Sequence, residues 1–499
     1  MLIKNSIIKK IIQKYEKIWS LNYLNSIVGW DTETYMPNAG ILARSKVLSN
    51  LSSLVQDLYL DSELLNLLDE VRGLSSLNIY ERKIIHVLDK QIEIFQKLPK
   101  KFVMEFSDLI AGASTTWALA KEKNDLGIFL PSLDKIFDKT RQKADFLGYK
   151  NEPYEAIFEQ YEEDFSIKDL DSYFDELKKF LEKIDLKNVE FKYSKDFKKV
   201  DYNKKNMKDL NSKVLDFFGE DRSNFRIDVS SHPFSIFMSL GDIRLTTNYQ
   251  KFDFTSSFFP TIHEFGHGLY ASQSNTELEY TPLWPETSYV LHESQSRFWE
   301  NMIGKSRNFI EVFINDFREL SPQFKNYSVE DFYQNFNAVE PSLIRTQADE
   351  ITYHFHILIR YEIEKALLNN EIKVSEVNEL WNSKYKQYLG IIPANYSDGL
   401  LQDIHWSFGS IGYFPTYSLG SALSAIWLES VEKDLQWNKI KNLTKGNIDE
   451  LKIWLKNNIH QYAGTYTFNE MTLKVSDKDF SIKPWEKYIK AKYKLNFDI

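Results

Sequence analysis

Apolar residues recur at helical spacing along most of this chain. In residues 166–184 they step by three and four positions, and Ser166 stands where the N-cap of a helix is expected. The same pattern covers residues 62–72, 80–97, 133–147, 351–368 and 374–388. Gly and Pro, which interrupt helices, number only 18 and 13 among 499 residues. The sequence therefore predicts a mainly α fold of long helices.

One stretch departs from this pattern. Residues 225–257 are rich in β-branched and aromatic side chains, with a predicted turn at Gly241 and Asp242. We expect a small antiparallel β element there. No change of composition marks a linker, so residues 1–499 are expected to form a single domain.

Composition removes several classes of function. A hydrophobic content of 43% supplies a large core and excludes global disorder. The absence of Cys excludes disulfides, Cys-ligated zinc and a thiol nucleophile. The net charge of -9 argues against nucleic acid as the main partner. No segment approaches the roughly 20 consecutive apolar residues of a membrane span. We expect a cytoplasmic protein whose basic N-terminal helix, within residues 1–19, packs on the core rather than on a membrane surface.

The strongest chemical signal is an HExxH motif, which runs from His263 to His267. On a helix, residues four apart share one face, so the two histidines can bind one zinc ion. Glu264 follows the first histidine and can serve as the general base that takes a proton from the attacking water. Two surface histidines flanking an acid would give the same letters, but seven of the nine histidines fall between residues 232 and 405, which favours a metal site.

A third ligand must come from elsewhere in the chain. The metzincin pattern would need Gly and His where this chain has Tyr270 and Gln273, so that class is excluded. A new helix is expected to begin near Thr287. From spacing alone Glu293 is the first candidate and Glu286 the second, and the wider set of downstream candidates is Glu277, Glu279, Glu286, His292, Glu293 and Glu300.

Two glycines of the predicted motif helix, Gly266 and Gly268, each cost about 1 kcal/mol relative to Ala. Close packing against a neighbouring element would explain them, and so would the need for space for a substrate strand beside the metal. The sequence does not separate these two explanations.

Several blocks beyond the motif resemble one family, the thermostable, Taq-type zinc metallocarboxypeptidases. The resemblance spans most of the chain in the family's order: WDTETYMP at 30–37, HPF at 232–234, DIRLTT at 242–247, HESQSRFWEN at 292–301, IRTQADEITYHFHILIRYEIE at 344–364, GLLQDIHW at 399–406 and GSIGYFPTYSLG at 409–420.

The resemblance implies a single helical zincin-type unit with two halves around a deep groove, and a homodimer. It also implies one Zn²⁺ per chain, for which Co²⁺ can substitute, bound by His263, His267 and Glu293, with Glu264 as the general base. This choice favours Glu293 over Glu286. The family removes single residues from the free C-termini of peptides with broad specificity.

The resemblance also suggests residues that bind substrate. Arg345 is the family's candidate for the free α-carboxylate, which an Arg can bind through two hydrogen bonds. From the sequence alone, an ion pair with Asp349 on the same predicted helix would be favoured instead. Asp242 and Arg244 are expected to order the β element, whose edge could pair with the substrate backbone.

Hydrolysis of a peptide bond also needs hydrogen-bond donors for the developing oxyanion. His405, Tyr417 and Tyr413 are the candidates, and Tyr417 is preferred slightly over Tyr413. Because the chain has 28 tyrosines, a role in the core is the alternative for both tyrosines.

The chain departs from the family pattern in three places. Asn248 stands where the family usually has Arg, and Ser421 where it usually has Asn. The segment YEEDFS at 161–166 lacks the expected Pro-Gly turn. The departures at Asn248 and Ser421 lie outside the metal set, so they concern substrate preference rather than hydrolysis.

Two other functions remain open from the sequence. The nearer alternative is a metallo-oligopeptidase that cuts inside short peptides on a related helical zincin scaffold. The other is a catalytically silent peptide-binding protein. The intact HExxH motif argues against this function, because a silent site has no need for the base Glu264.

Overall fold

A computed structural model describes residues 1–191, 193–194, 197, 200–221 and 223–497. The α-helices are α1 (Ser6–Thr34), α2 (Ile41–Tyr59), α3 (Ser62–Val71), α4 (Ile79–Lys97), α5 (Lys100–Lys123), α6 (Leu130–Leu147), α7 (Pro153–Phe158), α8 (Ile167–Leu181), α9 (Lys204–Phe218), α10 (Thr255–Ser272), α11 (Tyr289–Arg297), α12 (Arg307–Glu319), α13 (Val329–Phe336), α14 (Tyr353–Leu368), α15 (Val377–Leu389), α16 (Phe414–Leu435), α17 (Lys445–Asn458), α18 (Phe468–Ser476) and α19 (Lys483–Tyr493). The predicted mainly α fold is confirmed.

The helices predicted from periodicity correspond to α3, α4, α6, α8, α14 and α15. Ser166 is the N-cap of α8, because its hydroxyl accepts the N–H of Asp169 while the Asp169 carboxylate accepts the N–H of Ser166. The apolar stripe of α8 is fully turned into the core. Local spacing and capping chemistry therefore identified these helices correctly.

A three-stranded sheet fills the predicted β region. Its strands are β1 (Phe225–Val229), β2 (Ser235–Ser239) and β3 (Asp242–Thr247), in the order β1-β3-β2. The turn at Gly241 joins β2 and β3 into the expected antiparallel pair, but β1 pairs with β3 in parallel. The loop at 230–234 crosses the end of β3, where Ser230 N–H donates to Thr247 O and Thr246 N–H donates to Phe234 O. This crossing carries the chain to the other side of β3, so the sheet is mixed rather than wholly antiparallel.

The motif helix α10 lies between this sheet and α11. A Cβ atom on Gly266 would lie 2.7 Å from the carbonyl oxygen of Gln295 in α11. A Cβ atom on Gly268 would lie 2.7 Å from the ring of Phe225 in β1. Both glycines are therefore explained by close packing, which brings the metal-binding face of α10 next to α11.

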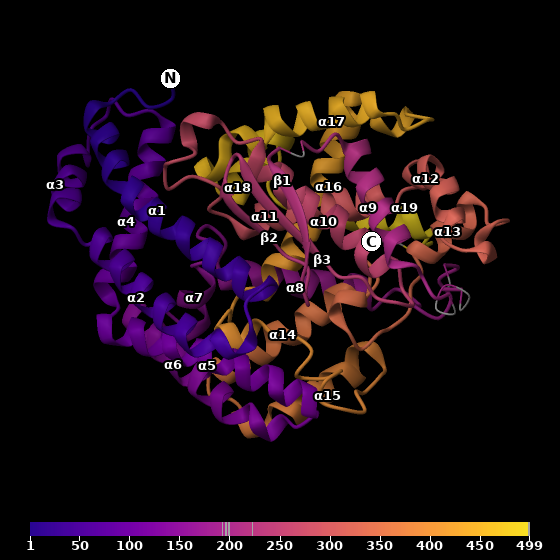
Figure 1. Cartoon of the computed structure of the whole chain (residues 1–499), viewed down its shortest axis with the longest axis horizontal. Coiled ribbons are helices and arrows are strands. Elements are labelled where there is room, and N and C mark those ends of the chain that lie inside the picture. The colour runs from indigo at the N-terminus through magenta and orange to yellow at the C-terminus, as the bar shows by residue number, and fades with distance from the viewer. Residues whose placement is uncertain (192, 195–196, 198–199, 222, 498–499) are drawn as a thin grey trace.

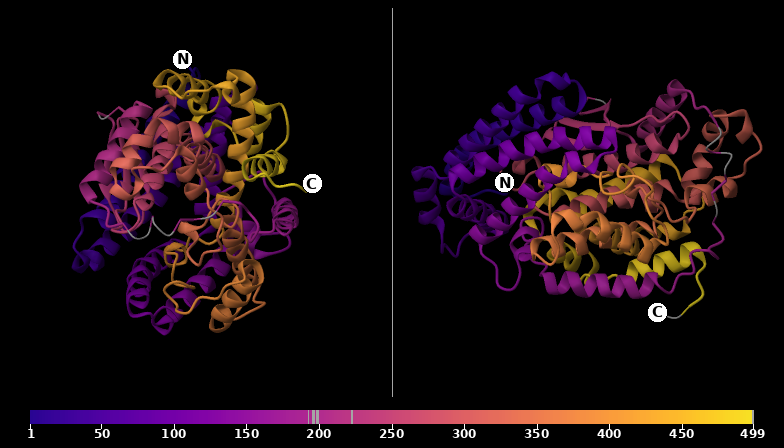
Figure 2. Two further views of the ribbon diagram at one scale, coloured as in Figure 1. Left: turned by 90° about the vertical axis from the view of Figure 1, so that its right-hand side faces the viewer. Right: turned by 90° about the horizontal axis from the view of Figure 1, so that it is seen from below.

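The N-terminal helices form a second apolar cluster beside the main core. In α1 the side chains of Ile8, Ile11 and Ile18 are fully buried, so this helix packs on protein as predicted. Figures 1 and 2 place α1–α4 at one end of the molecule and α12 and α13 at the other. At its far end α1 reaches the sheet, where Trp30 lies under the guanidinium groups of Arg226 and Arg244.

None of the helices in the described part of the chain combines the length and the apolar run that crossing a bilayer requires. The single domain and the deep groove between two halves stay predictions.

Candidate metal centre and active site

Two neighbouring helices bring three metal-binding side chains together. The four-residue spacing on α10 places His263 and His267 on one face, and α11, which begins after the N-cap Ser288, supplies Glu293. The Nε2 atoms of the two histidines lie 3.6 and 3.5 Å from Glu293 Oε2. Among the residues that the structure describes, this is the one group of three His or acidic side chains whose ligand atoms all lie within 4.8 Å of one another.

The spacing of these atoms fits a shared metal ion. Distances of 3.5 and 3.6 Å between nitrogen and oxygen are longer than hydrogen bonds. Two ligands that each lie about 2.1 Å from one tetrahedral ion are roughly 3.4 Å apart. Two imidazoles and one carboxylate are also a donor set that suits a catalytic zinc site with an open position. His263, His267 and Glu293 therefore fit such an ion.

Charged neighbours orient these candidate ligands. Glu300 lies in a π-helical segment, Phe298–Gly304, which continues α11, and its Oε2 atom is 2.9 Å from His263 Nδ1. Because Nδ1 is engaged by a carboxylate, Nε2 is left to face the metal. Arg297 donates from Nε to Glu293 Oε1 at 2.6 Å, and Ser296 donates to Glu293 Oε2 at 3.0 Å. Glu300 was a candidate ligand in the sequence, but the structure places it behind His263.

The other nearby candidates lie outside the cluster. His292 stacks on His267 with a distance of 3.8 Å between the ring centroids. Glu286 is largely buried, and its Oε2 atom has no hydrogen-bond partner. Burial raises the pKa of Glu286 to about 8. The structure therefore brings Glu293, and not Glu286, to the two histidines.

Glu264 is buried on α10 between the two histidines. Burial raises the pKa of its carboxyl, an effect that the charges of His263 and His267 and a hydrogen bond from Ser235 oppose. Ser235 begins β2, an edge strand of the sheet. A carboxyl with a raised pKa next to a metal site is suited to accepting and returning a proton near neutral pH.

A second group of site residues lies around the start of α16. His405 opens a 3₁₀ turn, His405–Phe408, and its Nε2 atom is 2.9 Å from the hydroxyl of Tyr417. The rings of Tyr413 and Tyr417 pack edge to face at 5.1 Å. Burial raises the pKa of both tyrosines, and the charge of Glu293 raises it further. The two tyrosines therefore lie within the electrostatic influence of the metal cluster.

Arg345 belongs to this second group. It lies in a 3₁₀ turn, Arg345–Gln347, where its Nε and Nη2 atoms are both 2.9 Å from Asp403 Oδ1. The expected ion pair with Asp349 is wrong. The helix begins only at Tyr353, and Asp349 accepts the N–H of Thr352 just before it. Two donors of Arg345, Nε and Nη2, are thus paired with Asp403, which lies 58 residues away in the sequence.

Tyr353 connects the arginine to the metal cluster. Its hydroxyl accepts a hydrogen bond from Arg345 Nη1 at 3.1 Å. Its ring lies 4.2 Å from the guanidinium carbon of Arg297, which holds Glu293. A continuous set of contacts therefore runs from Glu293 to Asp403 across one side of the site.

Asp242 and Arg244 hold each other and the N-terminal helix. Arg244 donates to both carboxylate oxygens of Asp242 at 2.8 Å, and its guanidinium carbon lies 4.5 Å from the ring centroid of Trp30. Both residues belong to β3, the central strand, so the edges of the sheet are formed by β1 and β2 instead. A role for this pair in substrate binding stays a prediction.

The departures from the family pattern have local partners. Asn248 donates from Nδ2 to the carbonyls of Ser230 and Ser231 at 3.1 and 2.8 Å, which ties down the loop between β1 and β2. Ser421 donates back to Tyr417 O within α16. In the YEEDFS segment, Glu162 accepts the N–H of Val290 at 2.7 Å at the start of α11.

Sequence reasoning missed several residues that hold the site. Asp403 lies inside a block that carries the family resemblance, which was the available signal for it, and Glu300 was named only as a candidate ligand and not as a partner of His263. Arg297 follows Glu293 by four residues and could have been inferred from helical spacing. Nothing in the sequence pointed to Glu162, because its partner in α11 lies 128 residues away.

The helical fold and the two-His, one-Glu cluster on adjacent helices define a metallopeptidase of the HExxH class. Residues 9–493 match the family described as Carboxypeptidase Taq (M32) metallopeptidase. The chain belongs to this family.

Relatives with known names support this assignment. The chain is 40% identical over 495 residues to thermostable carboxypeptidase 1 of Pyrococcus furiosus, covering 98% of this chain and 99% of the relative. It is 33% identical over 474 residues to carboxypeptidase 1 of Bacillus subtilis, covering 94% of each. Its structure is similar to that of the solved Pyrococcus furiosus carboxypeptidase, with a TM-score of 0.92, 38% identity and coverage of 99% of this chain and 100% of that one.

Proposed function

We propose that this protein is a metallocarboxypeptidase that hydrolyses the last peptide bond of peptides and releases their C-terminal amino acids with broad specificity. The observation that carries the proposal is the pairing of two groups in one site. The cluster of His263, His267 and Glu293 is connected through Arg297 and Tyr353 to the buried cation Arg345. A metal site alone would suit any peptidase, whereas a nearby arginine suits a substrate that ends in a carboxylate.

The metal ion that these residues would hold is Zn²⁺, with Co²⁺ as a substitute, because imidazole and carboxylate ligands suit both ions. When bound, such an ion supplies Lewis-acid activation of water and of the scissile carbonyl. Glu264 takes the proton of the attacking water and later gives it to the leaving amine. Arg345 holds the carboxylate of the leaving residue with donors that Asp403 and Tyr353 do not use.

Tyr417 supplies the donor for the oxyanion, and His405 orients its hydroxyl. Burial lowers the pKa of His405 to about 3, so its imidazole is neutral at physiological pH. If its Nε2–H donates to the Tyr417 oxygen, the tyrosine keeps its own proton free to donate to the oxyanion. Tyr413, which packs against Tyr417, is the alternative candidate for this donor. This assignment gives Tyr417 the direct contact and His405 the task of orienting it.

The cellular setting completes the proposal. The absence of Cys suits a cytoplasmic protein, since no disulfide would need an oxidising compartment. A homodimer is proposed from the family resemblance, and peptides with a free C-terminus are the proposed partners. The net charge of -9 argues against nucleic acid as a partner.

A ten-residue peptide tests the proposal when it is supplied as a free acid and as a C-terminal amide, with and without a metal chelator. Mass spectrometry of the products should show a ladder of C-terminal losses from the free acid only, abolished by the chelator. Internal cuts in both peptides would favour the metallo-oligopeptidase. No cleavage after Zn²⁺ or Co²⁺ is added back would favour the silent peptide-binding protein.

A further inference from the structure

Glu364 is a fully buried carboxylate on α14 that the proposed chemistry does not use. It accepts hydrogen bonds from Trp406 Nε1 at 2.7 Å, from the Tyr154 hydroxyl at 2.9 Å and from the Gly412 N–H at 3.0 Å. An acceptor-only carboxylate is suited to three donors, and burying one requires such partners. Burial raises the pKa of Glu364 to about 7, although these donors oppose the shift.

Two of the three donors belong to one short segment, residues 405–412. Trp406 directly follows His405, and Gly412 directly precedes Tyr413. The two oxygens of Glu364 therefore hold this segment close to both of its ends. The third donor, Tyr154, comes from α7 and lies outside the segment.

The same face of α14 holds the residues just before His405. Arg360, one helical turn before Glu364, is fully buried and donates from Nε to Asp403 Oδ2 at 2.6 Å. His405 thus lies between two points, Asp403 and Trp406, that are both fixed to α14. The position of the His405 imidazole depends on Glu364, which lies 41 residues earlier in the sequence.

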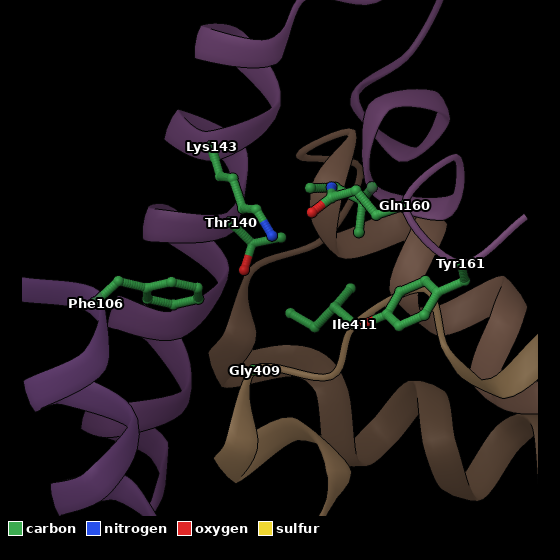
Figure 3. Close-up of a pocket in the computed structure, with 8 residues that line it drawn as sticks. Phe106, Thr140, Lys143, Gln160, Tyr161, Gly409 and Ile411 are labelled. Carbon is green, nitrogen blue, oxygen red and sulfur yellow. The ribbon is translucent and has the colours of Figure 1, made fainter. Parts of the chain in front are cut away.

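The rest of the segment packs against α5 and α7, since a Cβ atom on Gly409 would lie 3.0 Å from Ile110 and one on Gly412 would lie 3.0 Å from Ile157. Gly409 and Gly412 have φ angles of +67° and +85°, in the region that favours glycine. Gly409 and Ile411 border a small recess of about 10 Å³, with Phe106, Thr140 and Lys143 on its opposite wall (Figure 3). The hydrogen bonds to Glu364 act together with this packing, and they join both ends of the segment to α14.

We propose that Glu364 is a positioning residue that sets the geometry of the His405–Tyr417 pair by holding the segment 405–412 against α14. This inference rests on the proposed role of that pair in hydrolysis. Glu364 touches neither substrate nor metal; it acts through the segment that presents His405.

Three single variants separate this role from general stability. In Glu364→Gln the amide nitrogen replaces one of the two oxygens and meets either the Trp406 Nε1–H or the Gly412 N–H, so one anchor of the segment is lost in either orientation. Trp406→Phe removes the indole donor together with part of a buried ring system that packs on Phe137 and Trp381. Tyr154→Phe is the matched control, because it removes a donor that binds the same carboxylate but lies outside the segment.

We expect kcat to fall about 10- to 100-fold in Glu364→Gln and less in Trp406→Phe, as for small misplacements of catalytic groups. Tyr154→Phe should keep kcat near that of the wild type, and KM and metal content should stay unchanged in all three.

A double-mutant cycle with His405→Ala then tests whether Glu364 acts through the pair. His405→Ala alone should lower kcat, and adding Glu364→Gln should lower it no further. An undiminished effect of Glu364→Gln in the His405→Ala background, or a loss of kcat in Tyr154→Phe as large as in Trp406→Phe, would overturn the proposal. Wild-type kcat in His405→Ala would instead overturn the role of the pair itself, which distinguishes failure of the proposed mechanism from failure of this inference.

Discussion

The two sides of the site are built in different ways. The metal side takes His263, His267 and Glu293 from two adjacent helices, within 31 residues of one another in the sequence. The donor side takes Arg345 and His405 from 3₁₀ turns, and buried charges of α14 and the 399–406 block hold them in place. Helical spacing sets the two histidines on α10 and the next helix along the chain, α11, adds Glu293, whereas the second arrangement depends on partners that are distant in the chain. Variants of the two sides should therefore fail in different ways.

The largest effect is expected at the metal side, from Glu264→Gln. The amide cannot take a proton from water, so kcat should fall about 10²- to 10⁴-fold, the usual contribution of a general base. Metal content, measured by mass spectrometry of the dialysed protein, should equal that of the wild type. Loss of the metal together with activity would show instead that Glu264 helps to build the metal site.

On the donor side, Arg345→Lys should weaken recognition of the substrate carboxylate. Loss of a charge-assisted hydrogen bond costs about 1.5–3 kcal/mol, roughly a 10- to 150-fold change. We expect this change in KM for free-acid peptides, with metal affinity unaltered. Arg360→Lys is the control, because Arg360 holds the other oxygen of Asp403. Equal increases of KM in both variants would mean that Asp403, rather than substrate, is the partner that matters.

Glu300→Gln should weaken metal binding, although Glu300 is not one of the proposed ligands. The variant loses the negative charge that engages His263 Nδ1, and loss of such an outer partner typically weakens metal binding about 10- to 100-fold. Competition with a chelator of known affinity measures this change. The exposed Glu311→Gln on α12 controls for the change of net charge, and a comparable loss of affinity there would remove the proposed role of Glu300.

The smallest effect concerns Glu286, the rejected ligand. Its pKa of about 8 in the folded protein lies above the usual 4.5, so the folded state binds the extra proton between these pH values. The free energy of unfolding should therefore fall as pH rises through this window, and Glu286→Gln should remove that part of the slope.

Urea unfolding of the wild type and of Glu286→Gln at pH 5 and pH 8.5 measures the slope, with the exposed Glu16→Gln as control. Metal affinity should be the same in Glu286→Gln and in the wild type. A weaker metal affinity in Glu286→Gln would mean that Glu286 contributes to metal binding after all. The distinction drawn here between the two sides of the site would then be wrong.

The sequence by itself determined the elements and one side of the site. Periodicity and capping placed α8 and α14, and the four-residue spacing placed His263 and His267 on one face. The spacing of residues left both Glu293 and Glu286 as candidates for the third ligand, and the family resemblance then favoured Glu293. These features are local, because a helix of 3.6 residues per turn fixes which side chains share a face.

Only the tertiary structure decided the rest. It inserted β3 between β1 and β2, gave Arg345 the partner Asp403 instead of Asp349, and placed Glu300 behind His263. Periodicity shows that a face is buried but not what packs against it. The position of a buried charge is set by donors and acceptors contributed from distant segments, and these meet only when the whole core is assembled.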